Sequence, residues 1–109
     1  MNKTTEDLVK LQELDLALRE CRLVADGQSW SGGTELLKRM NRIRSQLPPD
    51  DVMKFDRMVA RGGLAVVEAA GQNCLGCHRT LPVAEWHAAL NGPTPVHCPH
   101  CQRFIYRTE

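Results

Sequence analysis

The chain has 109 residues, of which 42% are hydrophobic and 25% charged, and its formal net charge is +1 at pH 7. This composition is close to the globular average and excludes a disordered chain, and no apolar run approaches the length that spans a membrane. The balanced charge argues against a nucleic-acid binder with a wholly basic surface, although a local basic patch is compatible with it.

The beginning of the chain and its size set two further expectations. No apolar segment precedes the first helical pattern, so we see no secretory signal and expect a cytoplasmic location. A chain of this length forms either one ordinary domain or a small element joined to a metal-stapled module, and we interpret it as the second.

A first helix is predicted to begin at Thr4 or Thr5, because a hydroxyl can cap free backbone amides and acidic residues follow in the first turn. Its apolar residues recur at spacings of three and four, which is the pattern of one helical stripe. The stripe consists of Leu11, Leu14, Leu18 and Cys21. Cys21 continues the leucine pattern, so we interpret it as a buried small apolar residue rather than a reactive thiol.

A polar turn over residues 27–33 separates this helix from a second one, which Thr34 is expected to cap. The second apolar stripe consists of Leu36, Met40, Ile43 and Leu47. Pro48 and Pro49 end the helix, because proline lacks an amide proton and restricts the residue before it. Trp30, within the turn, is a candidate partner contact, although folding back onto the helices is an equal alternative.

The two helices should fold back on each other as an antiparallel hairpin. Residues 1–26 contain six acids and four bases, whereas residues 34–47 contain four bases and one acid, so the flanks are complementary in charge. A hairpin this short buries little surface of its own, and isolated helices of this length are marginal in water. We therefore expect it to pack on the rest of the chain, on a second copy or on a protein partner.

A third, shorter helix is predicted from Asp50 or Asp51 to the glycine pair that begins at Gly62. The run 64–67 is apolar and partly β-branched, so we predict a strand there. Residues 83–90 show helical spacing again and should cover the C-terminal module. The fold class is therefore α+β, with residues 1–61 forming the helical hairpin and connecting helix and residues 62–109 forming a small ribbon.

The strongest signal is a pair of cysteines spaced by two residues, followed after twenty residues by a second such pair. The four residues are Cys74, Cys77, Cys98 and Cys101. Two tight turns that each direct two thiolates at one ion complete the four ligands that zinc prefers. A closed shell of four thiolates leaves no position for water, so we predict one structural Zn²⁺ and no catalytic role for it.

Two alternatives use the same cysteines. The run Cys74 to His78 matches the attachment motif of a c-type haem, but this reading leaves the second cysteine pair without a role and requires an exported chain. A dithiol redox site is the other alternative, and it lacks the supporting βαβ pattern. His78, His97 and His100 lie beside the cysteines. We favour their interpretation as solvent-facing residues of the turns, and the alternative is that one of them replaces a ligand or orients the ligands from outside.

The chain resembles a bacterial family in which a coiled-coil hairpin precedes a four-cysteine zinc ribbon and some members are tied to flagellar or type III secretion systems. The similar stretches are residues 55–67, 74–82 and 97–106, with a partial likeness over residues 8–15. The resemblance implies a zinc ribbon, and it accounts for a Cys-x-x-Cys-His sequence without haem.

Two departures from that family stand out. The arms predicted here, about twenty and fourteen residues, are roughly 30 and 20 Å long and much shorter than the long coils of the family. Gln102 stands where the family usually has glycine after the last cysteine, at a position that favours a left-handed backbone.

No paired carboxylates, activated nucleophile or phosphate-binding glycine loop occurs in a convincing context, so we predict a protein that is not an enzyme and takes no small-molecule substrate. The leading hypothesis is a protein-interaction adaptor or chaperone-like accessory factor whose hairpin contacts a partner or a second copy. The alternative is a nucleic-acid-binding or transcription-regulatory protein. Its candidate contacts are Lys38, Arg39, Arg42, Arg79, Arg103 and Arg107.

Overall fold

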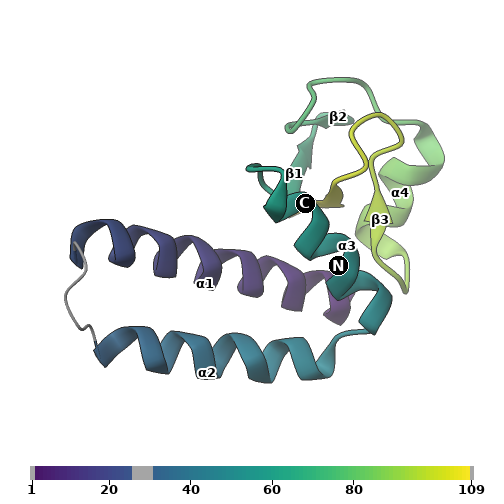
Figure 1. The fold of residues 1–109 in the computed structure, drawn as a ribbon. Coiled ribbons are helices and arrows are strands. Elements are labelled where there is room, and N and C mark those ends of the chain that lie inside the picture. The colour runs from purple at the N-terminus through teal and green to yellow at the C-terminus, as the bar shows by residue number, and fades with distance from the viewer. Residues whose placement is uncertain (1, 26–30, 109) are drawn as a thin grey trace.

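The computed structural model describes the backbone of residues 2–25 and 31–108, and the side chains of residues 2–20 and 34–108. The helices are α1 (Lys3–Ala25), α2 (Ser31–Gln46), α3 (Pro49–Ala60) and α4 (Val83–Asn91), and the strands are β1 (Val66–Ala70), β2 (Asn73–Cys74), β3 (Val96–His97) and β4 (Phe104–Tyr106). Figure 1 shows α1 and α2 side by side, with α3 leading from them to the sheet. The predicted α+β class, an N-terminal hairpin followed by a short helix and a small C-terminal ribbon, is confirmed.

The start of α1 differs from the prediction, because Asn2 caps the helix instead of Thr4 or Thr5. The amide of Thr5 donates to Oδ1 of Asn2 at 2.8 Å, which satisfies one of the free amides of the first turn. The side chain of Asn2 also donates through Nδ2 to the carbonyl of Gly92, just beyond α4, at 3.2 Å. Thr5 is buried instead of capping. Asn2 therefore both caps α1 and connects it to the residue that follows α4.

The other helix starts also need correction. Helix α2 begins at Ser31, three residues before the expected cap Thr34. Helix α3 begins at Pro49, with Asp50 and Asp51 inside its first turn and no side-chain cap. Proline is favoured at the first helical position, where its missing amide proton costs nothing, and the two acids complement the positive end of the helix. Trp30 and the side chain of Cys21 lie outside the described residues.

The strands form one mixed sheet in the order β2-β1-β4-β3, in which β1 and β4 are parallel and the two outer pairs are antiparallel. A two-residue turn with positive φ at Gly71 and Gln72 joins β1 to β2, which suits the right-handed twist of a hairpin. Strand β1 starts at Val66, two residues after the predicted start. The carbonyl of Leu64 accepts from Nε of Arg103 at 2.8 Å, so residue 64 is held by a side chain and not by a strand.

The sheet separates two hydrophobic cores, because successive residues of a strand point to opposite faces. On one face Val66 and Phe104 pack against the helices, and on the other Val67 and Ile105 pack near the cysteines. The first core contains Leu8, Leu11, Leu18, Met40, Leu47, Phe55, Ala65, Val66 and Phe104, and the second contains Val67, Ala69, Cys74, Leu81, Ala89, Cys98 and Ile105. The hairpin therefore packs on the ribbon, which is one of the arrangements expected from its small size.

A side chain that the sequence analysis did not single out fastens α1 to this sheet. Oε1 of Gln12 accepts from the amides of Ala65 and Val66, both at 2.8 Å, and Nε2 of Gln12 donates to the carbonyl of Val66 at 2.7 Å. The amide group of the side chain thus acts like a short piece of neighbouring strand at the beginning of β1. Among the described helices, none is long and apolar enough to cross a lipid bilayer.

We predict that Gln12→Ala lowers the free energy of unfolding by about 1–3 kcal/mol, because it leaves two amides and a carbonyl at the start of β1 without their partner. Urea unfolding followed by circular dichroism measures this change. Gln46→Ala is the matched control, since Gln46 is an exposed residue at the end of α2. Equal stability losses in the two variants would contradict a fastening role for Gln12.

Candidate metal centre

Two short turns of the same design carry the four cysteines. In the first, the amide of Cys74 donates to the carbonyl of Arg79 at 2.9 Å, and the amide of His78 donates to the carbonyl of Cys74 at 2.7 Å. The second turn repeats both bonds at the same offsets from Cys98, at 2.9 and 2.8 Å. Strand β2 leads into the first turn, and the second turn joins β3 to β4. Each turn therefore presents two sulfur atoms on one side of its backbone.

The four sulfur atoms converge on one point between the turns. All lie within 4.8 Å of one another, with Sγ of Cys74 3.7 Å from Sγ of Cys101 and Sγ of Cys77 3.6 Å from Sγ of Cys98. A tetrahedral ion with Zn–S bonds of about 2.3 Å needs sulfur atoms about 3.8 Å apart. The sulfurs are far too distant for disulfides, whose bond is about 2.05 Å, and the four cysteines fit one structural zinc ion.

Burial makes the thiolates dependent on a cation. Cys74 and Cys98 are fully buried, and Cys77 and Cys101 are half-buried. Burial raises the pKa of the Cys74 thiol to about 12, although the backbone amides of Cys77 and Gly76 lower it in part. Zinc supplies the positive charge that offsets this burial, and it competes with protons for the same sulfurs, so acidification favours loss of the ion.

The residue after each turn adopts a left-handed backbone. His78 has a φ of 62° and Gln102 a φ of 63°, and both carry side chains. For residues with a Cβ atom this conformation costs roughly 1–2 kcal/mol. The left-handed conformation expected at residue 102 is therefore present, and the same constraint occurs at residue 78.

The histidines near the site lie in different environments. His78 and His100 are exposed, as expected for turn residues. His97 is half-buried, with its ring 4.3 Å from that of Phe104 and its Nδ1 3.2 Å from the carbonyl oxygen of Gln102. Burial lowers the pKa of His97. The expectation of a solvent-facing side chain was therefore only partly right for this residue, because β3 places it beside the sheet.

The candidate nucleic-acid contacts are spread over separate parts of the molecule. Lys38, Arg39 and Arg42 are exposed on α2, where Arg39 lies 3.6 Å from Glu35. Arg79 is exposed on the first turn. Arg103 donates to the carbonyl of Leu64 and lies against Gly63 and Gly76, where an added Cβ would meet it at 3.3 and 3.2 Å. Arg103 therefore joins the second cysteine turn to the first and to the loop after α3.

Arg107 is also engaged within the protein. Its guanidinium carbon lies 3.5 Å from the centre of the Trp86 ring, and Nη1 donates to the carbonyl of Trp86 at 2.9 Å. Such stacking of a cation on an aromatic ring contributes about 0.5–2 kcal/mol. Trp86 is half-buried against the second core, so the pair fixes the last residues of the chain to α4.

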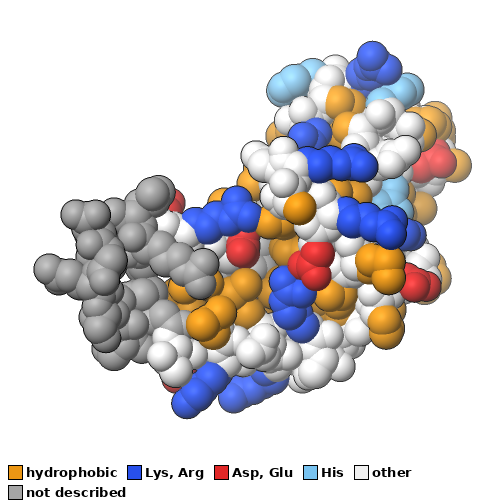
Figure 2. Space-filling view, in the orientation of Figure 1, with side chains coloured by type: hydrophobic (Ala, Val, Ile, Leu, Met, Phe, Trp, Pro, Cys, Tyr) orange, Lys and Arg blue, Asp and Glu red, His pale blue; other side chains and the backbone are white. Residues whose placement is uncertain are grey.

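Another group of cations was missed by the sequence analysis. Lys54, Arg57 and Arg61 lie on α3 and its C-terminal end, and all three are exposed. Their spacing of three and four residues places them on one helix face. This spacing is the feature of the sequence from which the group could have been predicted. Figure 2 shows Lys and Arg side chains gathered over α3 and continuing toward the ribbon.

Comparisons with known proteins agree with the metal centre. Residues 73–105 match the family described as a C4-type zinc ribbon domain. Two solved structures have a similar fold: the CT398 protein of Chlamydia trachomatis, 23% identical with a TM-score of 0.58 over 70% of this chain, and the HP0958 protein of Helicobacter pylori, 18% identical with a TM-score of 0.62 over 85% of this chain. No curated protein matches the sequence.

This chain corresponds to only part of each of the two solved structures. This chain covers 33% of the first and 38% of the second. At these identities the likeness establishes the fold alone. Together with the converging sulfurs, the comparisons confirm the predicted four-cysteine zinc ribbon, whereas the haem and dithiol alternatives would each require Cys74 and Cys77 to act as a separate pair.

We predict that the double variant Cys74→Ser/Cys98→Ser loses its zinc, because two of the four ligands become weakly coordinating hydroxyls. Elemental analysis of the purified chain gives the number of ions per molecule. Cys21→Ser is the control, since Cys21 belongs to neither pair, and it should keep one ion. A chain that retains full zinc after the double substitution would exclude this site.

We predict that Gln102→Gly stabilises the second turn by about 0.5–1 kcal/mol, because relief of the left-handed strain exceeds the added flexibility of the unfolded chain. The expected result is slower zinc transfer to a chelator and a higher midpoint of unfolding. His78→Gly should behave in the same way. His100→Gly, at a position where φ is not positive, should have no such benefit, and an equal gain there would refute the strain argument.

Proposed function

We propose that this chain is a non-enzymatic, cytoplasmic zinc-ribbon protein that acts as a protein-interaction adaptor or chaperone-like accessory factor. The observation that carries the proposal is the exposure of apolar side chains on a hairpin that is otherwise packed on the ribbon. Leu16 on α1 is 39% exposed and Leu37 on α2 is 42% exposed. Apolar side chains that stay exposed on a helical surface are available for contact with a protein partner or a second copy.

The attachment of the hairpin supports this role. Gln12 and the first core connect α1 to β1 and β4, and Arg44 on α2 forms two hydrogen bonds with Asp56 on α3, at 3.0 and 2.8 Å. A contact surface held in this way binds with less loss of conformational freedom than a free hairpin. In this proposal the ribbon, residues 62–109, is the platform, and the helical part, residues 1–61, makes the contact.

We predict that Leu16→Ser/Leu37→Ser abolishes the contact through the hairpin. Sedimentation velocity of the zinc-loaded chain tests self-association, and quantitative mass spectrometry of proteins retained from an extract of the source cells tests other partners. Val83→Ser is the control, since Val83 is an apolar residue on α4 that is more exposed, at 59%, than either leucine. If the double variant sediments and captures proteins exactly as the unsubstituted chain does, the hairpin is not the contact.

A second candidate function is nucleic-acid binding, which is favoured by the exposed cations Lys38, Arg39 and Arg42 on one stretch of α2. Phosphate contacts weaken steeply as salt rises, because bound counterions are released. Fluorescence anisotropy with single-stranded RNA at several salt concentrations, on the unsubstituted chain and on Lys38→Gln/Arg39→Gln/Arg42→Gln, tests this function. A flat salt dependence, or identical binding by the two proteins, would count against it.

A further inference from the structure

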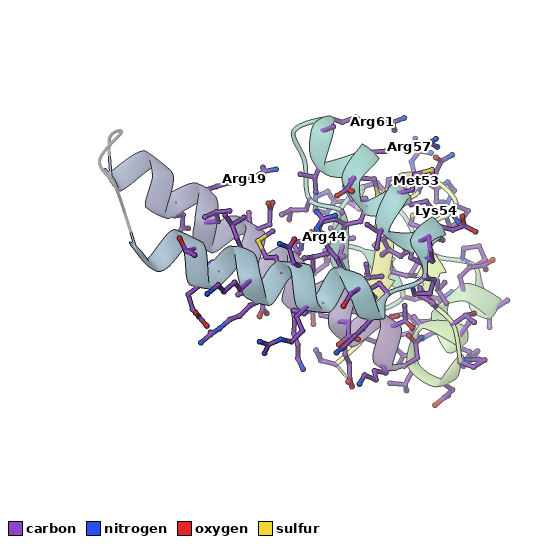
Figure 3. The ribbon with its side chains drawn as sticks, turned by 60° about the horizontal axis from the view of Figure 1, so that its bottom comes forward. Arg19, Arg44, Met53, Lys54, Arg57 and Arg61 are labelled. Atoms are coloured by element: carbon purple, nitrogen blue, oxygen red, sulfur yellow. The ribbon has the colours of Figure 1, made fainter. Side chains whose placement is uncertain are left out.

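A row of unpaired cations runs along the outer face of α3. Lys54, Arg57 and Arg61 are exposed and share one helix face. Within the described residues, the ion pairs are Asp15 with Arg19, Glu35 with Arg39, and Asp56 with Arg44, so none of the three cations is neutralised by an acid within 4.0 Å. Figure 3 shows them on α3, pointing away from the helical hairpin.

These cations border a groove between α3 and the second cysteine turn. One hollow of about 320 Å³ is lined by Lys54, Arg57, Met58, Arg61, His97 and Gln102. An adjoining hollow of about 270 Å³ shares Met58 and Arg61 with it and continues past Leu64 to Cys101 and Arg103. We call the two together the α3 groove. It reaches from the middle of α3 to one of the zinc ligands.

The charge of the α3 groove selects an anionic occupant. Its lining contributes four cations, Lys54, Arg57, Arg61 and Arg103, and no carboxylate. At one end of the groove the charge of Asp51 partly offsets the lowering of the His97 pKa by burial. Asp56 accepts two hydrogen bonds from Arg44 on the other side of α3. Because Arg103 is held in place by the carbonyl of Leu64, part of this positive charge is fixed before anything binds.

The apolar groups in and beside the groove distinguish a peptide from a nucleic acid. Leu64 is 45% exposed and Met53, four residues before Arg57, is 51% exposed, while Met58 lies in the groove itself. Grooves for single-stranded nucleic acid combine cations with aromatic rings on which bases stack. The nearby rings offer no exposed aromatic face, because Phe104 is fully buried, Tyr106 packs against the first core, and the half-buried His97 ring lies 4.3 Å from that of Phe104. Flexible methionine side chains instead suit the apolar residues of a peptide.

We infer that the α3 groove binds an acidic, amphipathic segment of a partner protein, whose carboxylates pair with Lys54, Arg57 and Arg61 and whose apolar side chain contacts Met58 and Leu64. This inference rests on the proposed adaptor function and adds to it a binding site and the chemistry of the partner. The hairpin leucines and the α3 groove would then be two contact surfaces on one rigid chain.

Selection from a displayed library of random peptides about twelve residues long, a length that spans roughly 18 Å as a helix, tests the inference on the zinc-loaded full chain. The selected peptides should be rich in Asp and Glu and carry at least one large apolar residue. Their affinity should fall by about tenfold or more in Lys54→Gln/Arg57→Gln/Arg61→Gln, because neutralised side chains no longer attract the carboxylates.

The matched control is Lys38→Gln/Arg39→Gln/Arg42→Gln, which removes the same charge from α2 and should leave peptide affinity unchanged. Zinc content and the midpoint of unfolding, measured on both variants, show that each is folded. If the substitutions only weaken a general electrostatic attraction, the peptide affinity falls equally in both variants. That result would overturn the proposed site.

The other outcomes separate this site from the adaptor function. If peptides are selected but bind the α3 variant as tightly as the unsubstituted chain, the site is wrong and the adaptor function stands. If no peptide is enriched and the hairpin leucines also prove dispensable, both fail. If single-stranded RNA of about twelve nucleotides displaces the peptides and binds more tightly than they do, the groove is a nucleic-acid site and the inference is overturned.

Discussion

The convergence of four cysteine sulfurs is the constraint on which the ribbon depends. The two turns are separated by residues 78–97, and they are brought together where β2 and the β3–β4 connection meet. The strands that hold them are two to five residues long, and sheets this small bury little apolar surface. A single ion that joins both turns supplies stability that the second hydrophobic core alone would not provide.

The sheet transmits this constraint to the helices. Strands β1 and β4 are adjacent and parallel, so Val66 and Phe104 form one surface toward α1 and α3 while Val67 and Ile105 form the other toward the cysteines. Gln12 then couples α1 directly to the first residues of β1. Movement of the cysteine turns and movement of the hairpin are therefore linked through only a few strand residues.

The metal ligands could be predicted from sequence because their spacing is a local property of each turn. The left-handed backbone at Gln102 was expected from the family resemblance, in which glycine usually follows the last cysteine. The stripes of α1 and α2 were also local signals, since a helical period needs no knowledge of the partner. The cap at Asn2 was missed because Thr4 and Thr5 offer the same chemistry two and three residues later, and only burial of Thr5 in the core decides between them.

The remaining differences depend on long-range contacts. In the sequence Gln12 is indistinguishable from an ordinary surface residue of a helix. Its role depends on contact with the amides of Ala65 and Val66, which are 53 and 54 positions away along the chain. The spacing of the cations on α3 could be seen in the sequence. The groove beside them could not be predicted, because its other wall is the second cysteine turn, which the fold brings next to α3. Arg103 and Arg107 were predicted as candidate nucleic-acid contacts, whereas in the fold Arg103 donates to the loop after α3 and Arg107 stacks on Trp86.

The most direct test of the account is X-ray absorption spectroscopy at the zinc edge of the purified chain. The structure predicts a single shell of four sulfur ligands at about 2.3 Å, with no nitrogen or oxygen neighbour at bonding distance. A shell that contains nitrogen or oxygen would show that a histidine or water replaces a cysteine, and would contradict the closed structural site on which the ribbon and the surfaces beside it depend.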